Sequence, residues 1–315
     1  MKSRRDFLKN VSIFTVSGVL AGSLNPLHVY AAVKDSAKFV KASKEIGLQL
    51  YSLGNNWFND IPGMMKKLKG MGYTKVELFG YNKGLVFGTN MMEVKKMIEH
   101  SGLKITSAHI SPPTKKYTKE NQKEIYDFWK MATDDHAKMD IKYIIQPGMP
   151  ESNSHEQVAF VCEVFNKVGQ TIKTGGCSFG YHNHSLEFQQ SLVRPENQGK
   201  SGDLGKGDRI YDLYLKNTDP ELVCFELDVF HQVEGGGDPV EYMQKYPDRI
   251  KLLHIKDYQV MGQSGMMNFE NIFNQVKKNG IKEWFVEIET LRNGMTQLEG
   301  AKNSIEYLKK SPFVN

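Results

Sequence analysis

Short apolar runs alternate with longer amphipathic runs from Ile46 to the end of the chain, and this alternation restricts the possible folds more than any other feature. The short runs have the length and the β-branched or aromatic content of buried strands. Eight of them occur, at residues 47–51, 75–79, 105–109, 143–146, 178–182, 224–228, 251–255 and 284–288. The pattern therefore predicts a sheet of eight strands.

The longer runs between the strands have a helical period. Val158, Val161, Phe165 and Val168 recur at intervals of three and four residues, which places them on one face of a helix. Glycines typical of helix ends follow several of these runs. The helices are predicted at residues 61–70, 92–101, 119–139, 155–174, 239–245, 269–279 and 298–309.

Eight β/α units in roughly 270 residues are typical of one fold, the (β/α)8 TIM barrel. A doubly wound open sheet alternates in the same way, but it commonly carries a phosphate-binding loop after its first strand. The sequence has neither a GxGxxG nor a GxxxxGK[ST] motif. We therefore predict an α/β, single-domain TIM barrel over residues 32–315, with the polar stretch 189–208 as a loop on its catalytic face.

The N-terminus reads as an export signal. Arg4 and Arg5 form a twin-arginine pair, a moderately apolar stretch follows at residues 11–24, and Ala31 and Ala32 provide small residues for cleavage. An uncleaved membrane anchor or a chance arginine pair are the alternatives. We expect residues 1–31 to be a twin-arginine signal peptide, the mature protein to be periplasmic, and no stable membrane anchor to remain after cleavage.

The charge balance of the remaining chain argues against nucleic-acid binding. The formal charge is +5, but the first 31 residues contain four bases and one acid, so the rest carries 37 bases and 35 acids. A net charge of +2 lacks the basic excess of a nucleic-acid binder. Three cysteines are too few for a disulfide framework, so the hydrophobic core must stabilise the fold.

Polar residues gather at the carboxyl ends of the last four predicted strands, where barrel enzymes carry their chemistry. Alternation puts two of them on the inner side of each strand: His182 and His184, Glu226 and Asp228, His254 and Lys256, Glu287 and Glu289. A single strand-end histidine is more often a hydrogen-bonding core or rim residue than a ligand, and a single acid, such as Asp257, often caps the next helix. Four consecutive strands with this property indicate one divalent cation, and the mixed nitrogen and oxygen donors suit Mn²⁺, Zn²⁺, Co²⁺ or Fe²⁺ better than Ca²⁺.

Five fragments of the sequence carry a resemblance to a known family. They are IGLQLY at 46–51, GYTKVELF at 72–79, YHNH at 181–184, LDVFH at 227–231 and LHIKD at 253–257. They resemble the xylose-isomerase-like TIM barrel superfamily and, within it, the sugar phosphate isomerase/epimerase group, including exported bacterial members. The resemblance covers essentially the whole mature chain and implies the barrel fold, but this group includes isomerases, epimerases, dehydratases and lyases.

The resemblance also implies a ligand set. Ketose epimerases of this superfamily hold one divalent metal with a Glu, an Asp, a His and a second Glu from strands five to eight. In this chain the Asp falls on Asp228, the His on His254, and the second Glu on Glu287, with Glu289 as its rival. The first Glu has no counterpart, because strand five offers His182 there, with His184 as the alternative. This departure puts the symmetric proton exchange of the epimerases in doubt.

The chemistry that follows is the removal of a proton next to a carbonyl, which gives an enediolate that a metal ion can stabilise. Glu287 is the expected base, provided that its surroundings raise its pKa. His231 and Lys256 are expected to steady substrate oxygens, and His184 or Glu187 to deliver a proton. Further candidates for binding the sugar are Tyr51, Glu77, His109, Gln146 and Glu289.

Three functions are compatible with these residues. The first is a metal-dependent isomerase or epimerase of an unphosphorylated sugar, since phosphorylated sugars are chiefly cytoplasmic. The second is a lyase that eliminates the aglycone of a 3-keto-glycoside through the same enediolate. The third is a non-catalytic sugar-binding protein, which would not need Asp228, His254 and Glu287 together. The sequence leaves the sugar, the metal and the oligomeric state open.

Overall fold

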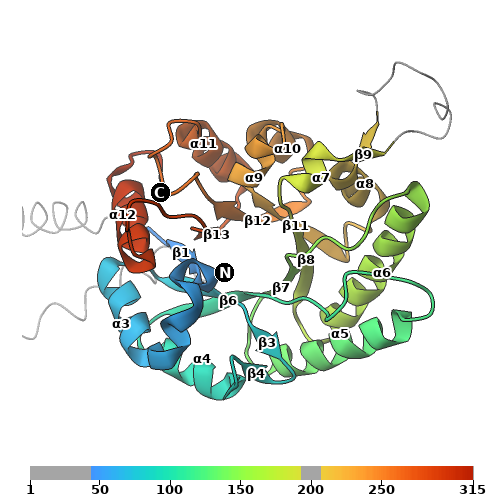
Figure 1. The fold of residues 1–315 in the computed structure, drawn as a ribbon, viewed down its shortest axis with the longest axis horizontal. Coiled ribbons are helices and arrows are strands. Elements are labelled where there is room, and N and C mark those ends of the chain that lie inside the picture. The colour runs from blue at the N-terminus through green and yellow to red at the C-terminus, as the bar shows by residue number, and fades with distance from the viewer. Residues whose placement is uncertain (1–43, 193–206, 315) are drawn as a thin grey trace, which may run out of the picture. The chain divides into compact units, whose positions relative to one another are not determined.

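Eight parallel strands form a closed barrel in the computed structural model, which describes residues 44–192 and 207–314. Around the barrel the order is β1-β13-β12-β11-β8-β7-β6-β2, so barrel strands that follow one another along the chain are also neighbours in space. Figure 1 shows them at the centre of a ring of helices. The bounds are β1 (Gly47–Gln49), β2 (Lys75–Leu78), β6 (Lys104–His109), β7 (Tyr143–Gln146), β8 (Ser178–His182), β11 (Val223–Asp228), β12 (Ile250–Ile255) and β13 (Glu283–Val286).

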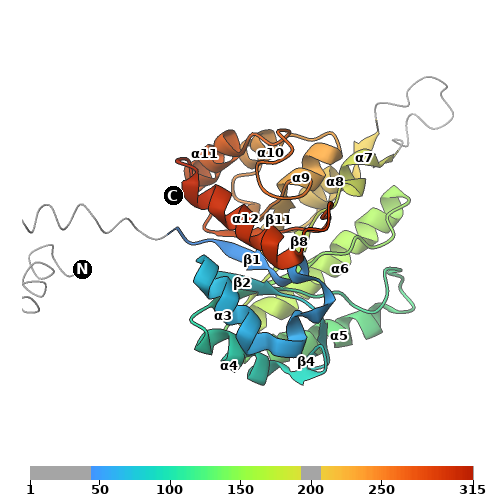
Figure 2. The ribbon, with the colours of Figure 1, turned by 60° about the vertical axis from the view of Figure 1, so that its left-hand side comes forward.

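The predicted barrel is confirmed, and each of the eight predicted strands is present. The outer helices are α3 (Ile61–Met71), α4 (Met91–His100), α5 (Gln122–Ala137), α6 (His155–Thr174), α10 (Pro239–Lys245), α11 (Phe269–Asn279) and α12 (Gln297–Lys310). Helix α12 packs against β13, which in turn pairs with β1 (Figure 2). The last helix of the chain therefore returns to the first strand and helps to close the barrel.

Several short elements in the connections were not predicted. After β1 the chain enters a 3-10 segment, η1 (Leu50–Asp60), and after β2 it forms a small antiparallel sheet of β3 (Tyr81–Asn82), β4 (Leu85–Val86) and β5 (Thr89–Asn90). The remaining additions are α7 (Leu186–Gln189), β9 (Ser191–Leu192), β10 (Asp208–Arg209), α8 (Ile210–Asn217) and α9 (Val229–Glu234). The predicted loop 189–208 thus begins and ends in the paired strands β9 and β10.

The first strand is shorter than predicted because a side chain ends it. The Gln49 side-chain oxygen accepts a hydrogen bond from the Tyr51 backbone N–H at 3.1 Å and caps η1. The strand therefore stops at Gln49, and Tyr51 projects from the 3-10 segment rather than from the sheet. Half of the Tyr51 side chain is exposed.

The interior of the barrel contains a compact apolar layer. Tyr143, Ile145, Leu252 and Phe285 form a separate buried cluster, with Cys224 packed against it. Gly180 lies at the same level, where a Cβ atom would approach Ile145 Cδ1 to 2.5 Å, so only glycine leaves room for the isoleucine. This apolar layer separates the amino ends of the strands from the polar residues at their carboxyl ends.

The predicted signal peptide, residues 1–31, lies outside the described residues, and so does the start of the predicted mature chain, residues 32–43. Export, cleavage and periplasmic location therefore remain predictions. In the part of the chain that the structure describes, the helices are all too short or too polar to cross a bilayer.

Candidate metal centre and active site

Four buried residues meet at the carboxyl end of the barrel. They are His182, Asp228, His254 and Glu287, each from or directly after a different strand, and one donor atom of each lies within 4.8 Å of the others. These are the four residues proposed from the sequence as metal ligands. We call them the mouth cluster.

Asp228 occupies the last position of β11 and the N-cap of α9. Its Oδ1 accepts a hydrogen bond from the backbone N–H of His231 at 2.8 Å, which caps the helix. Its Oδ2 is buried and has no hydrogen-bond partner among the described residues, and burial raises the pKa of the carboxyl. One oxygen therefore holds the chain and the other is free for a ligand.

His254 points its two ring nitrogens in opposite directions. Nε2 lies 2.6 Å from Glu77 Oε2, and Nδ1 lies 3.1 Å from Glu287 Oε2. A histidine held by a carboxylate at one nitrogen presents the other nitrogen to a metal in many metalloproteins. In the mouth cluster Nδ1 is thus the donor that His254 offers.

Lys256 lies among three carboxylates just beyond the mouth cluster. Its Nζ is 2.8 Å from Glu289 Oε2, 3.2 Å from Glu287 Oε2 and 3.8 Å from Asp228 Oδ2. Although burial opposes the ammonium charge, these carboxylates raise the pKa of Lys256. Lys256 is therefore a permanent cation, and its Nζ also lies 2.9 Å from His231 Nε2.

The pKa of Glu287 differs from the sequence expectation. The role of base requires surroundings that raise this pKa. Burial does raise it, but the charges of Lys256 and His254 outweigh burial and hold the pKa of Glu287 well below its usual range. For Glu289, the hydrogen bond from His231 and the charge of Lys256 overcome burial and lower the pKa to about 2. Both groups are carboxylates at neutral pH, so each can act as a ligand or proton acceptor but not as an acid.

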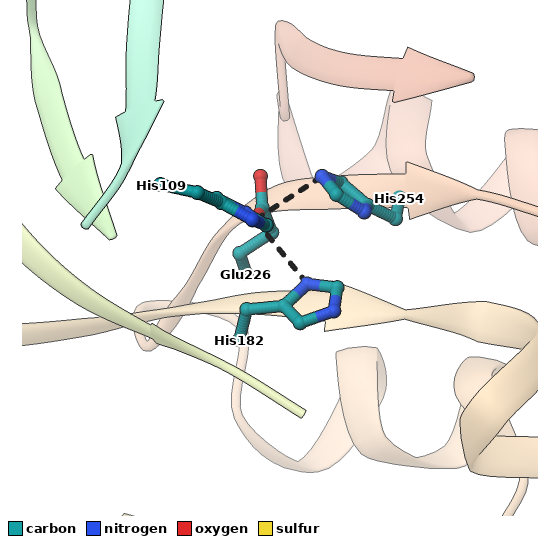
Figure 3. Close-up of side chains that lie close together, drawn as sticks. All are labelled: His109, His182, Glu226 and His254. Atoms are coloured by element: carbon teal, nitrogen blue, oxygen red, sulfur yellow. Dashed lines mark hydrogen bonds and ion pairs between the residues drawn. The ribbon is translucent and has the colours of Figure 1, made fainter. Parts of the chain in front are cut away.

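A layer of buried polar side chains lies beneath the mouth cluster. His109 Nε2 is 2.7 Å from Glu226 Oε2 and 3.3 Å from Glu77 Oε2. Figure 3 shows His109, His182 and His254 arranged around Glu226. Burial, followed by the neighbouring Glu77 charge, raises the pKa of Glu226 to about 7. The sequence pattern had placed Glu226 on the inner side of its strand but had not singled it out as a site residue.

A cavity of about 440 Å³ opens beside the mouth cluster. This volume lies within the range of about 300–1,000 Å³ that small-molecule sites occupy. Six of the predicted site residues line it, namely Tyr51, His109, His182, His184, Glu287 and Glu289. Burial, and then the charge of His231, lower the pKa of His184 to about 4, so its imidazole is neutral at pH 7.

Glu187 lines a second cavity of about 430 Å³, which shares Gly148 and His184 with the first. Its Oε1 accepts hydrogen bonds from the Tyr181 hydroxyl and, at 3.1 Å, from the His184 backbone N–H. Its Oε2 has no partner in the described part of the chain, and burial raises the pKa of the carboxyl. A carboxyl in this state can donate a proton.

Two of the residues predicted to bind sugar do not face either cavity. Glu77 is fully buried and accepts hydrogen bonds from Gln49 Nε2 at 2.8 Å and from His254. Gln146 is buried and bonded to the Tyr117 hydroxyl at 3.0 Å and to the Gly148 carbonyl at 2.9 Å. For Glu77 and Gln146, whose alternative was a purely structural role, these contacts favour that role over direct sugar binding, since neither side chain lines either of the two cavities.

The mouth cluster fits a divalent metal on its own chemistry. Asp228 Oδ2 is buried without a hydrogen-bond partner in the described structure, while His254 Nδ1 and His182 Nδ1 face carboxylate oxygens, Glu287 Oε2 at 3.1 Å and Glu226 Oε2 at 3.3 Å. Buried polar atoms that lack partners cost free energy, which a cation would repay. Two imidazoles and two carboxylates are a donor set that Zn²⁺, Mn²⁺, Fe²⁺ or Co²⁺ accepts.

The family model described as "Xylose isomerase-like TIM barrel" matches residues 65–311. The chain belongs to this family. A solved structure of a sugar phosphate isomerase/epimerase from Parabacteroides distasonis is 50% identical to this xylose isomerase-like barrel, with a TM-score of 0.81, and the match covers 86% of this chain and 100% of that one. The resemblance read from the sequence is thus confirmed.

More distant relatives differ in the reactions that their names describe. The inosose dehydratase of Mesomycoplasma hyopneumoniae is 24% identical to this chain over 181 residues. The match covers 50% of this chain and 55% of that relative, so this chain spans only about half the length of the dehydratase. The 3-keto-D-glucoside 4-epimerase of E. coli is 18% identical, with a TM-score of 0.64 over 85% of this chain and 100% of that one, a likeness of fold alone.

Proposed function

We propose that the protein is a divalent-metal-dependent sugar isomerase or epimerase that acts through an enediolate on an unphosphorylated keto-sugar. The observation that carries this proposal is the convergence of His182, Asp228, His254 and Glu287, with donor atoms within 4.8 Å of one another, beside a cavity of small-molecule size. The 50% identical sugar phosphate isomerase/epimerase supports it.

The four residues of the mouth cluster would hold the ion, which when bound supplies Lewis-acid stabilisation of negative charge on adjacent sugar oxygens. Lys256 adds a fixed positive charge 3.2 Å from Glu287 and favours the same charge distribution. Glu287 lines the cavity as a carboxylate and takes the proton from the carbon next to the carbonyl. In the isomerase, the protonated Glu287 returns the proton to the neighbouring carbon, and the neutral His184 on the cavity wall forms a hydrogen bond with a substrate oxygen.

The unphosphorylated substrate follows from the proposed location. We propose that the twin-arginine pattern at residues 1–31 directs the protein to the periplasm, where sugar phosphates are scarce. The sugar and the identity of the metal remain part of the same proposal.

A second candidate is a lyase that expels a substituent from the same enediolate. Glu187 favours it, because its buried carboxyl lines the second cavity, burial raises its pKa, and its Oε2 has no hydrogen-bond partner among the described residues. Such a group is suited to protonating a leaving oxygen. The similarity to an inosose dehydratase, whose name describes an elimination, agrees with this candidate.

An exchange experiment tests both candidates. Metal-loaded protein is incubated in deuterated water with free ketoses and with 3-keto-glycosides, and the products are followed by NMR. Deuterium next to the carbonyl with the glycosidic bond intact supports the isomerase or epimerase, and release of the aglycone supports the lyase. A Glu287→Gln variant serves as the control, since it removes the proposed base. No exchange with any of these substrates would refute both candidates and favour a sugar-binding protein.

A further inference from the structure

Five side chains form a second set of potential metal donors deeper in the barrel. Four of them, His109 of β6, His182 of β8, Glu226 of β11 and His254 of β12, have donor atoms within 4.8 Å of one another, and Glu77 of β2 contacts His109 and His254. We call these five side chains the deep cluster. Figure 3 shows that the rings of His109, His182 and His254 surround the Glu226 carboxylate from three sides. The deep cluster shares His182 and His254 with the mouth cluster, but Glu77, His109 and Glu226 belong to it alone.

The distances within the deep cluster are close to those of a tetrahedral metal site. His109 Nε2 lies 2.7 Å from Glu226 Oε2 and 3.3 Å from Glu77 Oε2. His254 Nε2 lies 2.6 Å from Glu77 Oε2 and 3.3 Å from Glu226 Oε2. Donors held at about 2.0–2.1 Å from Zn²⁺ in a tetrahedron are about 3.3–3.4 Å apart. A small outward movement of two of these pairs therefore makes room for an ion among the four atoms.

The charges of the deep cluster also call for a cation. Glu77 and Glu226 are both fully buried, and each has a second oxygen, Oε1, without a partner among the described residues. Two carboxylates side by side in a low-dielectric interior repel each other unless a cation or a shared proton lies between them. His182 Nδ1 lies 3.3 Å from Glu226 Oε2, so it is a further possible donor here, although a single nitrogen can bind only one of the two ions.

We propose that the deep cluster binds a divalent cation of its own, of the zinc type, in addition to the ion proposed for the mouth cluster. His254 can serve both sites as a bridging imidazolate that has lost its ring proton to solvent, because Nε2 faces the deep cluster and Nδ1 faces Glu287. His109 and His182 line the cavity, so the ion reaches the deep cluster from the barrel mouth. The deep ion fixes the orientation of His254 and His182 and thereby of the mouth cluster above it.

The competing explanation is a network of shared protons. In that case the short contacts from His109 to Glu226 and from His254 to Glu77 are hydrogen bonds, and the deep cluster holds no metal. The two explanations differ in one measurable respect, because only the first requires a bound ion that survives damage to the mouth cluster.

Zinc content in matched variants tests the proposal. Purified protein is stripped with a chelator, dialysed against Zn²⁺ and analysed for zinc by mass spectrometry. In the Asp228→Asn background, which damages the mouth cluster alone, one Zn²⁺ per chain should remain. Adding His109→Gln or, separately, Glu226→Gln should remove it, with at least about a hundredfold loss of affinity, while adding His136→Gln, a buried histidine on α5, should not.

Each outcome decides the proposal. An Asp228→Asn protein that binds no zinc overturns it, and so does a retained zinc that neither His109→Gln nor Glu226→Gln removes. Circular dichroism confirms folding, and the isosteric Glu226→Gln keeps the test valid if His109→Gln fails to fold. Visible spectra after Co²⁺ substitution give a second readout of donor geometry. The deuterium-exchange experiment with the unmodified protein tests the proposed sugar chemistry separately, so the two proposals can fail independently.

Discussion

Two buried lysines at opposite ends of the barrel have contrasting surroundings. Lys75, at the amino end of β2, lies 2.9 Å from Glu283 Oε2 and donates to the Lys282 carbonyl at 2.7 Å. Lys256, just after the carboxyl end of β12, faces Asp228, Glu287 and Glu289. At the base one carboxylate meets one cation, whereas at the mouth three carboxylates meet one lysine.

The difference separates a structural ion pair from a site prepared for a ligand. The Lys75–Glu283 pair is complete, since Thr106 also donates to Glu283 Oε2 at 3.1 Å. At the mouth, Asp228 Oδ2 is buried without a hydrogen-bond partner among the residues that the structure describes, and Lys256 Nζ lies 3.8 Å away from it. A complete pair contributes to stability, and an incomplete one is retained for function at some cost in stability.

Asp228→Asn should give the largest functional effect. The amide keeps the Oδ1 cap on α9 but removes the charge from the mouth cluster, so the mouth metal should be lost and kcat/KM should fall by about a thousandfold or more, equivalent to several kcal/mol of lost Lewis-acid stabilisation. Metal analysis and steady-state kinetics measure the two effects.

The same variant also tests whether the mouth cluster lowers the stability of the metal-free fold. Because burial raises the pKa of Asp228, the charged carboxylate is unfavourable in the metal-free fold. The metal-free variant should therefore unfold at no lower a temperature than the metal-free parent. A clear drop in its Tm, or full activity with the mouth metal retained, would mean that Asp228 is a structural residue like those at the base.

Lys75→Met should show the opposite behaviour. Removing the lysine leaves Glu283 largely buried without its cation and should lower the free energy of unfolding by about 3 kcal/mol, without changing kcat. Denaturant unfolding measures this loss. The matched control is Lys123→Met, which removes an exposed ion pair to Asp127 on α5, with side chains 86% and 64% exposed, and should cost no more than about 0.5 kcal/mol. Equal losses in the two variants would contradict the contrast between base and mouth.

Glu187→Gln divides the chemistry of the mouth between its two candidates. The amide oxygen can still accept from Tyr181 and from the His184 N–H, so the local fold should persist. If the lyase candidate holds, release of the aglycone should slow by about a hundredfold, while deuterium exchange beside the carbonyl continues at the parental rate. Equal slowing of both steps would assign Glu187 to proton abstraction or to packing instead.

A buried histidine away from both ends provides the smallest test. Burial lowers the pKa of His136 to about 4, and its Nδ1 lies 2.7 Å from the Ala132 carbonyl oxygen. The folded pKa lies below the unfolded value of about 6.5, so its contribution is complete above pH 6.5 and is lost as the pH falls towards 4, by about 2 kcal/mol at pH 5. Unfolding of a His136→Gln variant between pH 7 and 5 should lack this part of the slope, with or without metal. An unchanged slope would place the acid sensitivity at the mouth.

Periodicity was sufficient to predict the barrel and its principal elements. Helix α6 occupies the predicted residues 155–174, because its apolar positions recur without interruption and Ser154 caps its start. The small sheet β3–β5 escaped prediction because its strands are only two residues long and carry no alternation of their own.

The sequence was sufficient to predict which side of a strand each site residue faces, but not its position along the barrel axis. Alternation places Glu226 and Asp228 on the same inner side, and both face the barrel interior. It does not tell how far along the tilted barrel axis each side chain lies, which is why Glu77 was assigned to sugar binding although it lies below the cavity. The expectation that Gln146 binds sugar has a different weakness. Tyr143 and Ile145 of the same strand face inwards, so alternation places Gln146 on the other side.

The apolar layer of Tyr143, Ile145, Leu252 and Phe285 closes the interior of the barrel below the polar residues. Water, protons and ions cannot cross packed hydrocarbon easily, so everything that reaches His254 or Glu226 must enter and leave by the same opening. A sugar seated in the cavity would then also close the route for exchange with solvent. The proposed substrate, once bound, would therefore control the exchange of water, protons and ions between the buried polar residues and the solvent.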